Sequence, residues 1–143
     1  MDTVVRPLAF CGLLPFVVIS AMLALGVVEA PIVGPLLPIL SSYSLLIVAF
    51  MAGTHWGICM NSDTPLKGPI FLLSNAIALA AWFAHFIALP PLELVIDAGA
   101  LVGLLVVEHR FAVPLAVDDR YLKMRTQVTA IAVTALLVAA VRV

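Results

Sequence analysis

Charged residues make up only 10% of this 143-residue sequence, whereas hydrophobic residues make up 64%. Soluble domains carry about 25% charged residues, so the composition excludes a soluble domain and favours an integral membrane protein. Eight glycines are too few for a collagen-like repeat, and two cysteines are too few for a disulfide-stabilised scaffold. The net charge of −1 provides no basic surface for phosphate groups, and we expect no nucleic-acid partner.

Sequence motifs of the common enzyme classes are also missing. The chain has no H-E-x-x-H metal motif, no glycine loop for phosphate and no G-x-S-x-G nucleophile turn. We therefore expect a non-enzymatic protein without catalytic residues.

Five long apolar stretches account for most of the chain. A helix needs about 20 apolar residues to cross about 30 Å of hydrocarbon. Strands of a β-barrel would instead alternate with a period of two over about 10 residues, which these stretches do not. The sequence predicts one all-α domain, a bundle of five transmembrane helices in contact with the lipid bilayer. The predicted helices cover residues 8–28, 42–60, 68–89, 92–111 and 122–141.

Basic residues are divided unequally between the two ends of such a bundle. Five crossings place the termini on opposite sides, and Arg142 alone falls on the side of the C-terminus. The positive-inside rule then predicts a cytoplasmic N-terminus in a bacterial inner membrane. The basic residues on the predicted cytoplasmic side are Arg6, Lys67, Arg110, Arg120, Lys123 and Arg125. The two cysteines, Cys11 and Cys59, lie toward the same side, where we expect free thiols packed among apolar groups.

Prolines indicate how the helices are shaped and joined. Pro15 falls inside the first predicted helix and should kink it, provided that a neighbour satisfies the freed carbonyl. Pro90 and Pro91 interrupt the helical pattern and predict a tight turn between the third and fourth helices. The proline-containing loop 29–40 should lie along the membrane interface.

An acidic stripe runs along the fourth predicted helix. At 100° per residue Glu93, Asp97 and Glu108 fall on one face, together with Ala100 and Leu104. Ionisable groups are costly inside a membrane, so this face should meet protein or water. We expect Glu93 and Glu108 to lie among the lipid headgroups and Asp97 alone to be buried. A path for protons or cations is the alternative.

Two G-x-x-x-G pairs mark faces on which helices can approach closely. They are Gly53 and Gly57 in the second predicted helix and Gly99 and Gly103 in the fourth. The contact can be internal, or it can join the chain to another membrane subunit or to a second copy.

The three histidines do not suggest a metal site. His55 and His85 are separated by about 15 Å in depth, given the rise of a helix. A two-histidine site of His55 and His109 is the alternative to structural roles, and we expect no metal. Convergence of His55, Glu108 and His109 at one depth would instead indicate an intramembrane enzyme, which is a further alternative. His85 follows Ala81 by four residues, a spacing that would let a flat macrocycle lie over the helix. We expect an interfacial anchor at His85 and no cofactor, with a quinone or tetrapyrrole there as the alternative.

Three segments resemble the domain-of-unknown-function 3429 family. They are residues 12–16 (GLLPF), 43–57 (YSLLIVAFMAGTHWG) and 121–129 (YLKMRTQVT). The resemblance covers nearly the whole chain and implies a multi-pass protein of proteobacterial or mitochondrial inner membranes, with no activity to carry over. The positions that match its motifs are Pro15, Tyr43, Gly53, His55, Trp56, Gly57, Tyr121, Arg125 and Thr129.

Several of these positions lie toward the cytoplasmic ends of their predicted helices. We therefore predict one polar cluster or ligand site at that end. Its candidate residues are Pro15, His55, Trp56, Tyr121 and Arg125, joined by Glu108 and His109.

Two functions fit the sequence. The first is an accessory or assembly subunit of a larger respiratory or photosynthetic complex, held through the glycine faces. The alternative is a carrier or binding protein for a small amphipathic molecule, a quinone, a lipid or a proton, with the acidic stripe and His85 lining the cavity.

Overall fold

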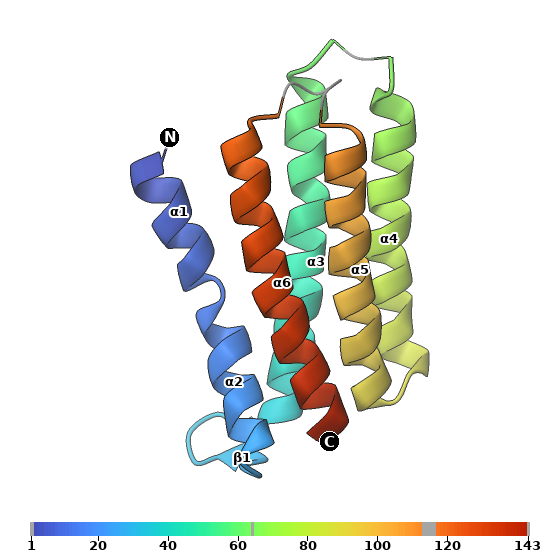
Figure 1. Cartoon of the computed structure of the whole chain (residues 1–143). Helices are drawn as coiled ribbons and strands as arrows, with labels where there is room; N and C mark the ends of the chain where they lie inside the picture. Colours follow the sequence, from blue (N-terminus) through green and yellow to red (C-terminus); the bar gives the residue numbers. More distant parts are fainter. Residues whose placement is uncertain (1, 64, 113–116, 143) are drawn as a thin grey trace.

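The computed structural model describes residues 2–63, 65–112 and 117–142, and it shows a bundle of long antiparallel helices (Figure 1). Within these described ranges, five segments are long and apolar enough to cross a membrane, as predicted, and the all-α bundle is confirmed. The first crossing is divided into two helices. A short hairpin of two antiparallel strands, each two residues long, follows it. The elements are α1 (Asp2–Cys11), α2 (Leu14–Ala24), β1 (Glu29–Ala30), β2 (Gly34–Pro35), α3 (Leu36–Met60), α4 (Lys67–Ile87), α5 (Pro90–Arg110) and α6 (Asp119–Arg142).

Three predicted boundaries are wrong, and local backbone chemistry explains two of them. The first crossing ends at Ala24 because Gly26 adopts a left-handed conformation with φ of 84°, which terminates the helix. The second crossing begins at Leu36 rather than at Ser42. Pro38 lies in the first turn of α3, where a missing N–H costs no hydrogen bond, so the proline-containing loop is shorter than predicted. The first crossing also begins earlier than predicted, at Asp2 rather than at residue 8, and the other boundaries agree within three residues.

The first crossing bends where the sequence predicts a kink. The chain leaves the helix at residues 12 and 13, and Pro15 lies in the first turn of α2. The Tyr43 hydroxyl of α3 donates a 2.8 Å hydrogen bond to the carbonyl of Gly12. Its ring packs edge-on against Phe16, with 5.1 Å between ring centroids. A neighbouring helix therefore satisfies a carbonyl at the break.

α5 contacts three other helices, α3, α4 and α6, whereas α2 packs against α3 and α6. The core between them consists of interlocking aliphatic side chains with little or no exposed surface. Its most buried members are Phe16, Leu40, Val48, Leu94, Leu104 and Leu136. α1 leans away from the other helices at the end of the bundle that carries the N-terminus (Figure 1).

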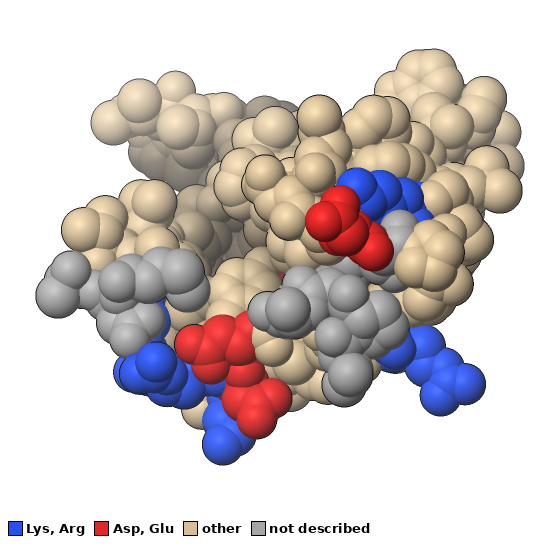
Figure 2. Space-filling model, turned by 90° about the horizontal axis from the view of Figure 1, so that it is seen from above, with Lys and Arg blue, Asp and Glu red and all other residues tan. Residues whose placement is uncertain are grey.

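The two ends of the bundle differ in charge. The N-terminus lies at the same end as the α3–α4 and α5–α6 connections, and the C-terminus lies at the other (Figure 1). We call these the N-terminal end and the C-terminal end. Figure 2 shows basic and acidic side chains around the rim of the N-terminal end.

The two cysteines are free, Cys11 exposed and Cys59 buried.

Tyr43→Phe should destabilise the protein by about 1 kcal/mol, because the Gly12 carbonyl loses a hydrogen-bond donor at the break. Thr54→Val is the matched control, since the Thr54 hydroxyl bonds to the carbonyl of Met51 within the same helix. Denaturant unfolding in mild detergent micelles measures both. Equal effects of the two variants would contradict a role for Tyr43 in holding the break.

Candidate functional site

The inward face of α5 carries two fully buried carboxylates. Asp97 and Glu108 each have 0% exposed surface, and Glu93 is half-buried. The expectation that Asp97 alone would be buried is therefore wrong for Glu108, because α6 supplies it with an ion-pair partner. A buried charge needs such partners, and each of the three acids finds one on another helix.

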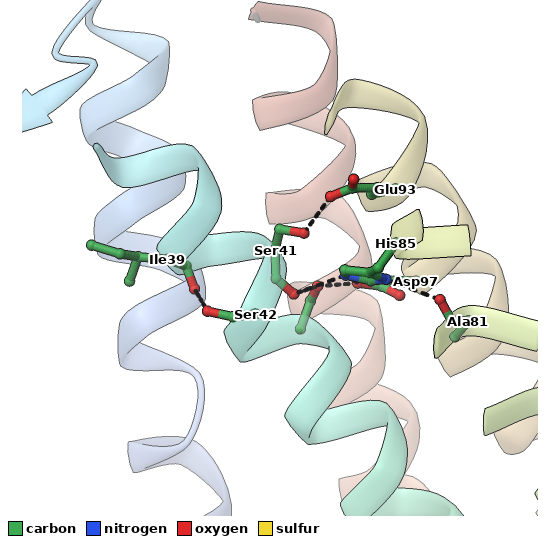
Figure 3. A network of polar contacts seen from close by, with 8 residues as sticks. Ile39, Ser41, Ser42, Ala81, His85, Glu93 and Asp97 are labelled. Atoms are coloured by element: carbon green, nitrogen blue, oxygen red, sulfur yellow. Dashed lines mark hydrogen bonds and ion pairs between the residues drawn. The ribbon is translucent and has the colours of Figure 1, made fainter. Parts of the chain in front are cut away.

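A polar network joins α3, α4 and α5 near the C-terminal end of the bundle (Figure 3). Ser41 of α3 donates a 2.6 Å hydrogen bond to Glu93 Oε2 of α5. One turn along α3, Ser44 hydrogen-bonds to Asp97 Oδ2. His85 of α4 completes the network, with its Nε2 3.6 Å from the same Asp97 oxygen. We call Ser41, Ser44, His85, Glu93 and Asp97 the acidic network.

The contacts of His85 define which of its ring nitrogens faces the acidic network. Its Nδ1 donates to the carbonyl of Ala81 at 2.9 Å, which leaves Nε2 to face Asp97 and, at 3.4 Å, the carbonyl of Ser41. Since both neighbours of Nε2 are oxygen acceptors, a proton shared between His85 and Asp97 satisfies the pair. Asp97 Oδ1 has no hydrogen-bond partner among the described residues. The network can therefore accept one further hydrogen bond, at Asp97 Oδ1.

His85 turns inward onto Asp97, with 16% of its side chain exposed. The prediction of an interfacial anchor at His85 is therefore wrong. Asp97 and the Ser41 carbonyl attract the His85 ring toward α3 and α5 (Figure 3). Ligation of a tetrapyrrole through Nε2 would require His85 to leave both oxygens. Among the residues that the structure describes, no group of three or more His, Cys, Asp or Glu side chains is placed to hold a metal ion.

A groove of about 750 Å³ opens between α3 and α4 directly beside the acidic network. Ser41, His85 and Glu93 line its polar end, and leucine and alanine side chains line most of the remainder. Trp82 and Asn75 contribute to the same wall of α4. We call this hollow the α3–α4 groove. Its volume falls within the range of about 300–1,000 Å³ that is typical of small-molecule sites.

A second buried pair lies toward the N-terminal end. Arg125 Nε of α6 donates to Glu108 Oε2 of α5 at 3.0 Å, and both side chains are buried. Tyr121 lies one turn before Arg125 on α6 and interacts electrostatically with both partners. The structure therefore brings together Glu108, Tyr121 and Arg125 of the predicted polar cluster.

The remaining members of that predicted cluster are distributed differently. Trp56 is partly exposed and stacks on Phe71 of α4, with 4.6 Å between ring centroids. His109 is exposed, and its Nε2 lies 3.3 Å from the Thr126 hydroxyl. His55 is buried, its Nδ1 contacts the carbonyl of Met51, and its Nε2 has no partner among the described residues. Their contacts join these three residues to different neighbours instead of to one site.

The glycine pairs have different surroundings. A side chain added at Gly103 would meet Ile77 of α4 at 3.5 Å, so this glycine lies in an internal contact. A side chain added at Gly53, Gly57 or Gly99 would meet no atom within 4 Å. These three glycines leave shallow outward faces on α3 and α5.

Sequence reasoning missed Ser41 and Ser44. Both are buried on the face of α3 that also carries Val48, Ala52 and His55. The helical spacing of Ser41, Ser44 and His55 along one face was the available signal, since polar residues inside a membrane helix turn toward protein. Ser41 was missed also because it lay just outside the predicted second helix, which began at residue 42.

Comparison with known proteins gives one family. A family model described as "Protein of unknown function (DUF3429)" matches residues 1–141. No curated protein and no solved structure matches the chain. The family match spans nearly every residue of the bundle, including both buried acidic sites. The chain therefore belongs to the DUF3429 family of proteins.

Proposed function

We propose that this multi-pass membrane protein binds a small amphipathic molecule in the α3–α4 groove. The observation that carries the proposal is the position of the acidic network at one end of a groove of about 750 Å³. An apolar groove that ends in a few convergent polar groups is the usual form of a small-molecule site.

The apolar part of the groove suits a hydrocarbon body. Leu45 and Leu46 on α3 face Ala78 and Leu79 on α4 across it. These side chains offer surface area but no hydrogen bonds, so they favour a tail or ring without polar atoms. The groove also borders Trp82, whose flat indole suits contact with a ring.

The polar end favours a neutral head group. Glu93 and Asp97 contribute two carboxyl groups, and His85 is the basic group beside them. An anionic head would meet net negative or neutral charge there, whereas a hydroxyl can donate to Glu93. A carbonyl can share the N–H of His85 Nε2, whose contacts with the Ser41 carbonyl and with Asp97 are long, at 3.4 and 3.6 Å. A quinone or quinol has both the head and the tail that this arrangement suits.

Quenching of Trp82 fluorescence measures this binding directly, because Trp82 lines the groove. The chain has two tryptophans, and Trp56→Phe leaves Trp82 as the reporter. A benzoquinone with a short isoprenoid tail should quench the emission of the detergent-solubilised protein with saturation. His85→Gln and Glu93→Gln should each weaken binding about tenfold, since both side chains line the groove and a charge-assisted hydrogen bond contributes about 1.5 kcal/mol or more.

His109→Gln is the matched control for His85→Gln. Both histidines contact the carbonyl four residues earlier through Nδ1, but His109 lies near the opposite end of the bundle. The His109→Gln variant should leave the affinity for the benzoquinone unchanged. Unsaturable quenching, or equal affinities of His85→Gln and the parent protein, would refute a quinone site in this groove.

A second candidate function is that of an accessory or assembly subunit in a larger inner-membrane complex. The open faces at Gly53, Gly57 and Gly99 favour it, because small residues allow another helix to approach closely. The concentration of basic residues toward the N-terminal end supports a cytoplasmic N-terminus in such a membrane.

Native gels after extraction in a gentle detergent test this second function. The chain should migrate within a larger assembly, and Gly53→Leu with Gly57→Leu should release it, because the added side chains would keep a partner helix away. Ala76→Leu and Ala80→Leu on the exposed face of α4 provide the control. Migration of the parent protein as a small homo-oligomer alone would contradict an accessory role.

A further inference from the structure

We propose that the N-terminal end of the bundle holds one anionic phospholipid between α1 and α6. Two adjoining hollows carry the inference: a basic pocket at the rim and an apolar groove that continues from it toward the middle of the bundle. The phosphate would lie in the first hollow and an acyl chain in the second.

The basic pocket has a volume of about 230 Å³. Arg6 of α1 faces Arg120 and Lys123 of α6 across it, and Gln127 adds a neutral polar side chain. Arg120 forms an ion pair with Asp118, with 3.5 Å between Nε and Oδ2. Arg6 and Lys123 form no ion pair within the described part of the chain. The pocket therefore presents positive charge that a phosphate can balance.

The beginning of α6 already carries two acidic residues that suit the helix dipole. Asp118 accepts the Arg120 N–H at 2.9 Å, and Asp119 is the first residue of the helix. Arg120 and Lys123 lie within about one turn of this end, where cations are unfavourable. A phosphate bound between their side chains would reduce that repulsion.

The apolar groove begins where the basic pocket ends. The two hollows share Val5, Tyr121 and Met124 in their walls. The groove has a volume of about 350 Å³ and reaches as far as Ala132 on α6. Arg125 lies in its wall, but Glu108 already balances that charge. Hydrocarbon chains match this lining, and soluble anions such as free phosphate do not.

The position of α1 makes the groove accessible from the bilayer. α1 leans away from α6 at this end, which leaves room between them (Figure 1). Its Val4 and Leu8 side chains are largely exposed on the border of the groove. Basic pockets between membrane helices are a known form of site for anionic lipid head groups. The geometry here adds a separate channel for one acyl chain.

Native mass spectrometry of the full chain in mild detergent tests the site. Phosphatidylglycerol and phosphatidylcholine with identical acyl chains are the two probes, and inorganic phosphate is the competitor. The parent protein should retain phosphatidylglycerol in preference, and phosphate should not displace it. Arg6→Gln with Lys123→Gln should weaken that binding about 30-fold, since each basic residue contributes on the order of 1 kcal/mol.

Two matched controls separate this site from general surface charge and from poor folding. Lys67→Gln with Arg110→Gln removes the same two residue types outside both hollows and should leave binding nearly unchanged. Ala9→Phe fills the apolar groove and should weaken both lipids, whereas Ala80→Phe on the exposed face of α4 should not.

Three outcomes would overturn the proposal. Equal losses in the two charge variants would assign the preference to the surface as a whole. Equal retention of the two lipids by the parent protein would remove the role of the basic pocket. Displacement of phosphatidylglycerol by inorganic phosphate would indicate a site for a soluble anion.

Discussion

Burial of two carboxylates on one face of α5 is the constraint on which the rest of the bundle depends. Asp97 and Glu108 each have 0% exposed surface in a segment that is mostly apolar. An isolated charge there would cost several kcal/mol, so each acid requires a partner from another helix. α3 and α4 supply Ser44 and His85 to Asp97, and α6 supplies Arg125 to Glu108. These contacts define how three helices are oriented around α5.

The same constraint makes the two ends of the molecule chemically different. Toward the C-terminal end, the acidic network opens onto the α3–α4 groove, where the carboxyl groups of Glu93 and Asp97 disfavour an anionic ligand. Toward the N-terminal end, Glu108 is neutralised by Arg125, and Arg6 and Lys123 add positive charge around the adjoining pocket. A neutral quinone-like molecule and an anionic lipid therefore suit opposite ends, and neither proposed site competes with the other.

The sequence was sufficient to predict the bundle, but the polar contacts required three dimensions. Hydropathy alone predicted five crossings, because apolar length is a local property. The partner of Glu108 was not predicted, since Arg125 lies 17 residues away on another helix and its pairing depends on the relative rotation of α5 and α6. Ser41 lay just outside the helix predicted for residues 42–60, because the proline-containing loop was predicted to continue to residue 40, although a first-turn proline such as Pro38 is tolerated.

A double-mutant cycle on Glu108 and Arg125, followed by unfolding in bicelles, tests the central constraint most directly. Each single variant, Glu108→Leu or Arg125→Met, leaves one buried charge unpaired and should destabilise the protein by about 3–5 kcal/mol. The double variant replaces both charges with apolar groups of similar size and should recover most of that stability. Additive losses in the double variant would contradict the account, because they would show that the two side chains do not depend on each other.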